Sequence, residues 1–551
     1  MTDGRMEERS KKHTTSFAGK RFLPFLFSLC FSLCMVFGRC LDREGSVPFR
    51  HPGLWAAVVI LTAAGTLLTG FLWKLLSKGG KRLEKQIPAS VTGRDFAVTA
   101  LLIFLCYLPV FLGEYPGFFV YDAQDELMQV VTRNFSTHHP LLHVLLLGGI
   151  IQLVHKISGS YNLGIACYTL FQMGVMSCIF SYGICHLRKE GLSRGKSFLM
   201  AIYLGLFPTV VMFVLCSAKD GLFTGMLFLQ VLMIRELVKS PENFFREKRY
   251  VILLAVSSVL MMLLRHNGFY AFFVFAALFL LLHRVTGLAV FLRKTALLFA
   301  GILAAYLILN KGLVFVLHAD ISENQEMLTV PIQQMARVYA MEEDSLTQEQ
   351  KETLYEILPE EALSHYTPKL SDPVKISFNN DAYEKNPGKY LKLWAQIGVK
   401  HPFAYLNAWF MTSYGFWYPD TVIDVYRGNT VFTFTYGDSS YFGYEVEQPG
   451  VRHSLIPVID RFYRWLSLDP AIQKVPVLKW LFSPGALLWV MLFILGYFCY
   501  AGYGKKAVCY FLPLLVFMTV LLGPTYLVRY VVFWWVLLPV LFFELAERFD
   551  N

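Results

Sequence analysis

Long apolar segments separated by short basic loops make up most of the 551-residue chain. A helix needs about 20 mostly apolar residues to cross a bilayer, and fewer where it packs inside protein. The segments that meet this requirement are 22–38, 54–73, 96–112, 162–186, 198–215, 221–238, 250–264, 269–283, 295–317, 485–503, 507–522 and 530–547. The pattern predicts an all-α polytopic membrane protein with about twelve transmembrane helices, although the short segments 250–264 and 269–283 could instead form one broken hairpin.

The polar segment 318–484 interrupts this pattern and is long enough for one small domain. Thr347 followed by Gln350 forms a capping pattern, and Pro359 ends the predicted helix. A second helical run from Asn386 is rich in aromatic residues, which is typical of a membrane interface. Residues 430–447 alternate in a way that predicts a strand pair. We expect a transmembrane module (1–317), a mainly helical α+β extracytoplasmic domain (318–484) and C-terminal transmembrane helices (485–551).

Composition narrows the class of protein. The chain is 55% hydrophobic with a formal net charge of +10, which excludes a disordered chain. The basic residues lie in short loops, so they carry information about membrane orientation and do not indicate nucleic-acid binding. No Gly-rich phosphate loop is present, and nucleotide donors are therefore not indicated. None of the ten cysteines falls in 318–484, which excludes a disulfide-stapled outer domain.

The apolar segment 140–155 decides the topology. If it crosses the membrane, the basic loop 187–197 lies outside. If it lies along the outer surface, that loop lies inside, and most Lys and Arg residues then fall on the cytoplasmic side, as the positive-inside rule requires. We therefore expect a multi-pass protein of the cell membrane with both termini in the cytoplasm and with 114–160 and 318–484 outside.

An acidic loop, 113–160, follows the third apolar segment. It carries Asp122, Asp125 and Glu126, then His138 and His139. Ionisable groups beside a bilayer are costly to keep unless they are hydrated and used. On a helix the three carboxylates would share one face, and crowding would raise their pKa values, which suits a general base or a metal site. A hydrated, helix-capping turn is the structural alternative.

Three cations are expected at the outer ends of apolar segments, on the same side as the acidic loop. They are Lys219, Arg265 and Arg529, which come from distant parts of the sequence. If they converge, they form a site for a lipid phosphate, because Arg gives paired hydrogen bonds to phosphate and Lys a point charge. The alternative is that each extends separately to the membrane interface.

The order of an apolar helix, a loop with Asp122 and then His139-Pro140-Leu141-Leu142 resembles the first outer loop of the GT-C superfamily of polytopic glycosyltransferases. The string from Pro331 to Arg337, with Arg265-His266-Asn267-Gly268 and the His-His-Pro motif, resembles a family of uncharacterised multi-pass proteins from Gram-positive bacteria that is itself GT-C-like.

The resemblance implies transfer of a sugar from a polyprenyl-phosphate donor to a cell-envelope glycan, lipid or protein. Asp122 matches the family's loop carboxylate, which acts as general base or helps to hold a metal, with Asp125 or Glu126 in support. The expected substrate-binding residues are Lys219, Asp220, Arg265, His266, Arg337, Arg529 and Tyr530. His138 and His139 would position substrate or bind a divalent cation, Mg²⁺ or Mn²⁺, unless their role is structural. Membrane lipids are expected partners and nucleic acid is not.

Two other classes of protein compete with this interpretation. A transporter or flippase for a lipid-linked glycan would place charges and broken helices near the middle of the bilayer. Here the charges gather at the ends of the apolar segments, which favours an enzyme. A non-catalytic envelope scaffold would explain the polar segment but leaves the acidic loop without a role.

Overall fold

The computed structural model describes residues 17–79, 89–321, 324–423 and 448–546, and these contain helices but no β-strands. The helices before residue 318 are α1 (Phe17–Glu44), α2 (Pro52–Gly79), α3 (Gly93–Gly113), α4 (Ala123–Thr132), α5 (Leu141–Ser158), α6 (Tyr161–Lys189), α7 (Arg194–Leu206), α8 (Pro208–Leu215), α9 (Asp220–Lys239), α10 (Pro241–Arg246), α11 (Lys248–Leu264), α12 (His266–Leu281), α13 (His283–Thr286), η2 (Ala289–Phe291) and α14 (Leu292–Leu317). Every apolar segment predicted in this part of the chain is therefore helical.

The second half of the chain continues with η3 (Asn324–Glu326), α15 (Thr329–Glu342), η4 (Glu343–Ser345), α16 (Gln348–Tyr355), α17 (Glu360–Ser364), α18 (Asp372–Lys375), α19 (Asn380–Lys385), α20 (Pro387–Lys400), α21 (Pro402–Ser413), η5 (Tyr414–Phe416), α22 (Pro457–Leu468), η6 (Pro470–Lys474), α23 (Leu478–Leu481), α24 (Pro484–Tyr500), α25 (Gly504–Val508), α26 (Phe511–Val520), η7 (Val528–Val531) and α27 (Phe533–Ala546). The predicted strand pair 430–447 lies outside the described residues. The described residues of 318–484 are helical, so the β part of the expected α+β domain is not observed in them.

Eight described helical segments are long and apolar enough to cross a membrane: Arg21–Glu44, Pro52–Lys78, Gly93–Gly113, Leu141–Ser158, Tyr161–Lys189, Asp220–Lys239, Ala289–Leu317 and Val528–Ala546. Helices α7 and α8 are bent by 57° at Phe207 and would make a ninth span together. Shorter apolar helices are α12, α24 and α26. The part of the chain that the structure describes is thus all-α with membrane-spanning character, and the count of twelve stays a prediction.

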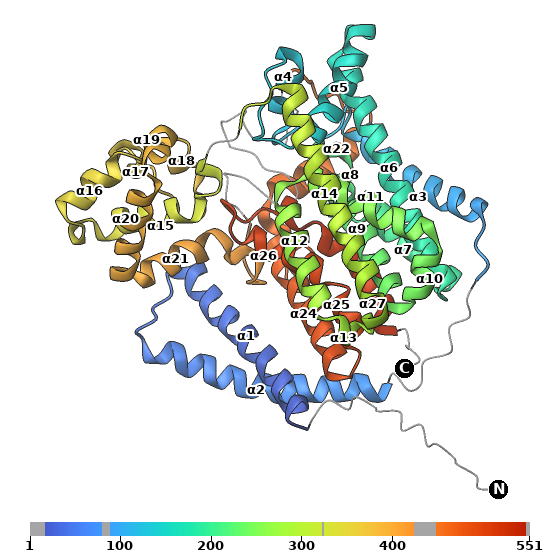
Figure 1. Cartoon of the computed structure of the whole chain (residues 1–551), viewed down its shortest axis with the longest axis horizontal. Helices are drawn as coiled ribbons and strands as arrows, with labels where there is room; N and C mark the ends of the chain where they lie inside the picture. Colours follow the sequence, from blue (N-terminus) through green and yellow to red (C-terminus); the bar gives the residue numbers. More distant parts are fainter. Residues whose placement is uncertain (1–16, 80–88, 322–323, 424–447, 547–551) are drawn as a thin grey trace.

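Helix α9 forms the centre of the bundle and is buried along the membrane-length window (Figure 1). Helices α6, α11 and α27 pack around it. Helices α6 and α9 run in the same direction, because Met176 contacts Gly225, Gly183 contacts Phe228, and Glu190 pairs with Arg235. Both helices therefore start at the end of the bundle that holds the acidic loop, which we call the acidic-loop end.

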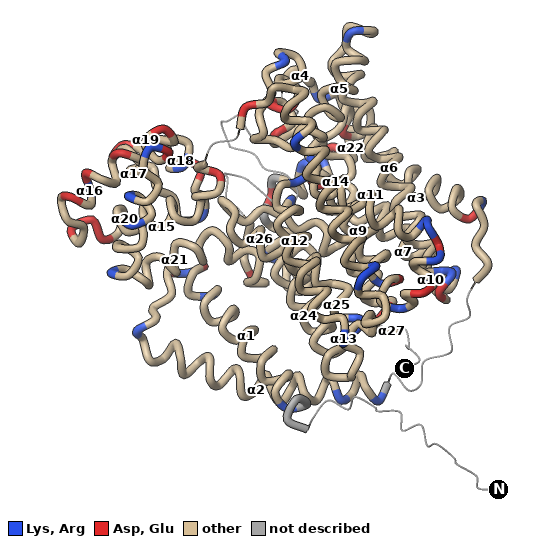
Figure 2. The backbone as a smooth tube through the Cα atoms, viewed as in Figure 1, with Lys and Arg blue, Asp and Glu red and all other residues tan. Residues whose placement is uncertain are grey.

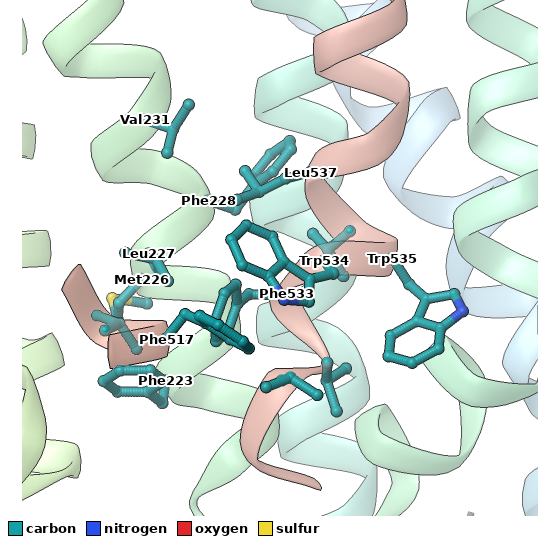
Figure 3. Close-up of a cluster of buried hydrophobic side chains, with 14 of the residues drawn as sticks. Phe223, Met226, Leu227, Phe228, Val231, Phe517, Phe533, Trp534, Trp535 and Leu537 are labelled. Carbon is teal, nitrogen blue, oxygen red and sulfur yellow. The ribbon is translucent and has the colours of Figure 1, made fainter. Parts of the chain in front are cut away.

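Aromatic side chains fill the space between α9, α26 and α27 (Figure 3). Trp534 is fully buried, and its ring centroid lies 4.6 Å from that of Phe533 and 5.7 Å from that of Phe517. Trp535 points to the other side of α27, where its Nε1 donates to the Leu481 carbonyl at 2.8 Å. Large rings of this kind dominate core energetics and fix α27 against α9.

Helix α5 forms an antiparallel hairpin with the first half of α6. Ile151 packs on Gly164, and His143 reaches Tyr168. Gln172, farther along α6, lies beside Gly221 at the start of α9. At 1.5 Å per residue, the part of α6 before Gln172 extends roughly 16 Å beyond the start of α9. The hairpin therefore projects past the acidic-loop end of the bundle, as Figure 1 shows.

Helices α15 to α20 form a separate unit with its own hydrophobic core (Figure 1). The sequence-predicted cap is confirmed, because Thr347 and Gln350 bond reciprocally at the start of α16. Acidic residues are concentrated on this unit, whereas Lys and Arg gather near α10, α13 and α25 (Figure 2). The unit contacts the rest of the chain through Arg337, which donates to the Gly45 carbonyl at 2.9 Å, and through Ser371, whose backbone N–H donates to the Pro524 carbonyl at 3.1 Å.

Replacing Trp534 with Ala should lower the free energy of unfolding by about 3–5 kcal/mol, because the truncation leaves a large cavity that the neighbouring rings cannot fill. Denaturant titration of the purified protein in detergent would measure the change. Trp465→Ala is the matched control, since Trp465 is 45% exposed and should be much less sensitive. Equal losses for the two variants would contradict the central role assigned to the Trp534 cluster.

Candidate functional site

A backbone contact brings the acidic loop to the start of α9. Phe118 N–H donates to the Leu215 carbonyl at 3.2 Å, and Ser217 N–H donates to the Phe118 carbonyl at 2.9 Å. The turn before this contact passes through Gly117, whose φ of +124° favours glycine. A Cβ at that position would also meet Thr169 Oγ1 at 2.4 Å. Asp122 and Lys219, far apart in sequence, are therefore held on facing segments.

Asp122 lies between two cations. Lys219 Nζ donates to its Oδ2 at 2.7 Å, and Arg529 Nη2 donates to the same oxygen at 2.8 Å. Its side chain is 26% exposed, so solvent reaches this carboxylate. Burial opposes ionisation, but the charges of Arg529 and Lys219 outweigh it and hold the pKa of Asp122 well below its usual range.

Asp220, at the first position of α9, joins the other cations to the network. Arg529 Nε donates to its Oδ2 at 2.9 Å, and Arg265 Nη1 donates to its Oδ1. The Arg529 guanidinium also lies 4.3 Å from the Tyr121 ring centroid, and the Arg265 guanidinium lies 5.0 Å from that of Tyr530. The carboxylate partners and the aromatic rings together offset the desolvation cost of the two guanidinium groups.

Glu126 is the buried anchor of a hydrogen-bonded chain. Its carboxylate contacts His143 Nδ1, and His143 Nε2 lies 2.8 Å from the Tyr168 hydroxyl. Tyr168 donates to Gln172 Oε1 at 2.9 Å, and Gln172 Nε2 donates to the Val214 and Cys216 carbonyls at 2.8 Å each. This chain ties the acidic loop through α6 to the segment before α9.

The charge of Glu126 is stabilised by the same surroundings. Lys219 Nζ lies 3.4 Å from Glu126 Oε1. Burial alone would raise the pKa of Glu126, but His143 and Lys219 lower it to about 2. Three carboxylates, Asp122, Glu126 and Asp220, thus face three cations, Lys219, Arg265 and Arg529, at the acidic-loop end. We call these six residues the ion network.

Asp125 points away from the ion network. It lines an open hollow of about 360 Å³ together with other residues of the loop and the end of α14: Met128, Gln129, Thr132, Asn134, Ser136, His138, His139 and Asp320. Burial and the nearby Asp122 carboxylate raise the pKa of Asp125. The hollow therefore offers a carboxyl group with a pKa different from that of its neighbours.

Two expectations about the carboxylates need correction. The three do not share one helical face, because Asp122 and Glu126 enter the ion network while Asp125 faces the hollow. Mutual crowding does not raise all three pKa values either. The pKa is raised only for Asp125, because cations adjoin Asp122 and Glu126 and lower theirs.

The remaining predicted substrate-binding residues lie at different distances from the network. Tyr530 joins it through its ring, whereas His266 is exposed and its Nε2 lies 3.0 Å from the Thr137 carbonyl. Arg337 does not join it, because its guanidinium is bound to Gly45 and to the Tyr366 hydroxyl at 3.2 Å.

Three residues of the site, Tyr121, Tyr168 and Gln172, were not predicted from the sequence. The i, i+4 spacing of Tyr168 and Gln172 inside an apolar helix was a signal that sequence reasoning missed.

One group at this site has the composition of a metal centre. Asp122, Glu126 and His139 each offer a ligand atom, and these atoms lie within 4.8 Å of one another. His138 is not a member of the group. The position between the three ligands is engaged by Lys219, whose Nζ contacts all three side chains. A resident divalent ion therefore does not fit without displacement of this ammonium.

Fold and site together define a polytopic helical protein with a buried ion network at one end of its bundle. The sequence profile of a family of unknown function (DUF6020) matches residues 129–547, and the chain belongs to that family. The matched range contains Lys219, Arg265 and Arg529 and begins after Asp122 and Glu126. No curated protein and no solved structure matches the chain.

The ion network should make stability depend on pH in acid. The native pKa of Glu126, about 2, lies below the ordinary value of 4.5, so its stabilising effect is complete above pH 4.5 and is lost as the pH falls towards 2. A lowering of this size corresponds to at most about 3–4 kcal/mol. Glu126→Gln should flatten the dependence of unfolding free energy on pH in this window, measured by denaturation in detergent.

Glu349→Gln is the control for this pH measurement, because Glu349 is exposed on α16. Its profile should follow that of the wild type. A Glu126→Gln variant that kept the full slope between pH 2 and 4.5 would contradict the assignment of the ionised carboxylate to Glu126.

Proposed function

We propose that this protein is an integral membrane glycosyltransferase of the GT-C type, which moves a sugar from a polyprenyl-phosphate donor to an acceptor of the cell envelope. The observation that carries the proposal is the state of Asp122. This solvent-accessible carboxylate is held through one oxygen by Lys219 and Arg529, and Lys219 also contacts His139, which lines a hollow that could admit a polar substrate. A base and phosphate-binding cations are the two requirements of such a transfer.

The donor phosphate would enter by exchange of partners. Lys219, Arg265 and Arg529 now bind carboxylates, and the donor phosphodiester offers the same cations two non-bridging oxygens and one negative charge, which becomes two as polyprenyl phosphate leaves. Each charge-assisted contact is worth roughly 1.5–3 kcal/mol. Lys219 and Asp220 also lie at the N-terminus of α9, where the helix dipole favours an anion.

This exchange would prepare Asp122 for catalysis. While Lys219 and Arg529 remain on its carboxylate, Asp122 is a weak base, because both cations hold its pKa low. Transfer of the cations to the phosphate would raise that pKa. The acceptor oxygen then forms a bond to the anomeric carbon, and the bond between that carbon and the phosphate oxygen breaks. The electron pair of the broken bond leaves with polyprenyl phosphate. The acceptor proton passes to Asp122.

The proposal includes the membrane arrangement expected from sequence: about twelve spans, both termini in the cytoplasm, and the acidic-loop end outside. In this arrangement α5 stays on the outer side of the membrane, where it projects from the bundle beside the first half of α6. Two observations support it. The α5–α6 hairpin projects past the start of α9, and Lys and Arg gather near α10, α13 and α25, away from the acidic loop (Figure 2).

A flippase for a lipid-linked glycan is a second candidate, favoured by one observation. Helices α7 and α8 form a broken span with a 57° bend, a feature that transporters use at substrate sites. A flippase would move the labelled lipid between leaflets of a vesicle without consuming it. A glycosyltransferase would release polyprenyl phosphate in proportion to the acceptor glycosylated.

Asp122→Asn should reduce sugar transfer by about 10²–10⁴-fold, because the amide cannot accept the acceptor proton. The assay follows label from a lipid-linked donor pool into acceptor in isolated membranes. Asp381→Asn, an exposed position on α19, is the isosteric control and should keep full activity. If Asp122→Asn retained wild-type transfer while Asp125→Asn lost it, the base would be Asp125. Full transfer by both would end the enzymatic interpretation.

Reporter fusions should place residue 192 in the cytoplasm and residue 400 outside. The physical reason is the retention of basic loops such as 187–197 on the cytoplasmic side. A phosphatase and a fluorescent protein, each active on one side of the membrane only, would be fused at both positions. An external residue 192 would put the end of α6 outside and the acidic-loop end on the cytoplasmic side, which would contradict this orientation.

A further inference from the structure

Lys219 Nζ occupies the centre of a ligand set that would suit a divalent cation. It lies 2.7 Å from Asp122 Oδ2, 3.3 Å from His139 Nδ1 and 3.4 Å from Glu126 Oε1. Carboxylate oxygens and an imidazole nitrogen are common ligands of Zn²⁺ and also suit Mn²⁺. The ammonium group is a compact point charge with three donors, so it can satisfy three such atoms at once.

The charges of the ion network leave no vacancy for a second cation. Its three carboxylates balance Lys219, Arg265 and Arg529. A divalent ion added to this balanced network would leave two uncompensated positive charges in a largely buried site, which is strongly unfavourable.

Lys219 is also held in place by the fold. It directly precedes Asp220 at the start of α9, and its side chain is only 10% exposed. The neighbouring segment is fixed by the bonds from Gln172 to the Val214 and Cys216 carbonyls. A divalent ion could enter only if the Lys219 ammonium gave up its carboxylate partners Asp122 and Glu126 in a largely buried position, which is costly.

We propose that the Lys219 ammonium is a built-in substitute for a divalent cation, so that this site works without a metal and becomes a metal site when Lys219 is removed. In this role the ammonium neutralises Asp122 and Glu126 in the resting protein. The further claim that the ammonium then binds the donor phosphate, as a metal ion would, rests on the proposed function. The metal-binding part does not, because it concerns only the residues of the ion network and His139.

The test measures bound metal in the full-length protein purified in detergent and stripped with a chelator. Wild-type protein, exposed to Zn²⁺ or Mn²⁺ and desalted, should retain neither ion at this site and should show no metal-dependent rise in its melting temperature. Lys219→Ala leaves Asp122, Glu126 and His139 around the vacated position. It should retain about one equivalent of Zn²⁺ and melt at a higher temperature with the ion than without it.

Two further variants make the result specific. The double variant Lys219→Ala/Glu126→Gln lacks both the ammonium and the Glu126 carboxylate. It has less unpaired buried charge than Lys219→Ala alone, so it should fold, but it should bind no Zn²⁺. Lys375→Ala is the matched control, because Lys375 also pairs with two carboxylates, those of Glu326 and Asp372, but has no histidine beside it. It should gain no metal. Methylammonium, a free analogue of the lysine head group, should compete with Zn²⁺ in the Lys219→Ala protein.

Two results would overturn the inference. One is a wild-type protein that retains an equivalent of Zn²⁺ or Mn²⁺ and loses it on Asp122→Asn, which would show that a metal displaces Lys219. The other is a monodisperse Lys219→Ala protein that binds neither ion. Both results come from metal-binding measurements without a sugar donor. If the metal-free wild-type protein showed no transferase activity, the inference about metal binding would therefore still hold.

Discussion

The acidic-loop end of the protein depends on one constraint, which is that charges removed from water must be paired. Glu126 and Asp220 are almost completely buried, and an isolated carboxylate in such a position would cost several kcal/mol or would become protonated. The structure meets this constraint by bringing cations from three distant segments to the acidic loop. The packing of α9, α12 and η7 at this end is therefore tied to the electrostatics of the site.

Hydrogen-bonding side chains of α5 and α6 hold the charged groups in position. The chain from Glu126 through His143 and Tyr168 to Gln172 ends on backbone carbonyls of the segment between α8 and α9. On the other side of the loop, the buried Glu114 pairs with Arg452. In a low-dielectric environment such fully bonded networks are rigid, and their geometry is set before a ligand arrives. This preorganisation suits a site that must bind an anion and keep a base close to it.

A second buried pair occupies the opposite end of the bundle. Arg235, four residues before the end of α9, is fully buried and contacts Glu190 after α6 and Glu544 in α27. Arg235 lies near an end of α9 that is predicted to be cytoplasmic, where a basic residue is expected, and its burial shows a structural role as well. Helices α6 and α9 are thus joined by an ionic contact at this end and by the hydrogen bonds of Gln172 to the segment before α9 at the acidic-loop end, which fixes them in parallel.

The sequence by itself determined the local features of this protein. Apolar segments of membrane length became helices, and the capping pair Thr347–Gln350 started α16, because helix formation depends on neighbours within a few residues. The cations and carboxylates that meet in the ion network could also be singled out, since charges at the ends of apolar segments are conspicuous. Their convergence required a topology, and orientation relative to a membrane stays a prediction.

Only the tertiary structure decided which of these groups touch. Arg529 reaches Asp122 across 407 positions of sequence, and no local pattern encodes such a pairing. Packing turned Asp125 towards the hollow, took Arg337 to the α1–α2 connection, and placed Lys219 among three potential metal ligands. Helical periodicity places a side chain on a face of its own helix. The packing of distant helices decides which opposite charge that side chain meets. Only this packing removes water from the charged groups, and a charge without water must be paired.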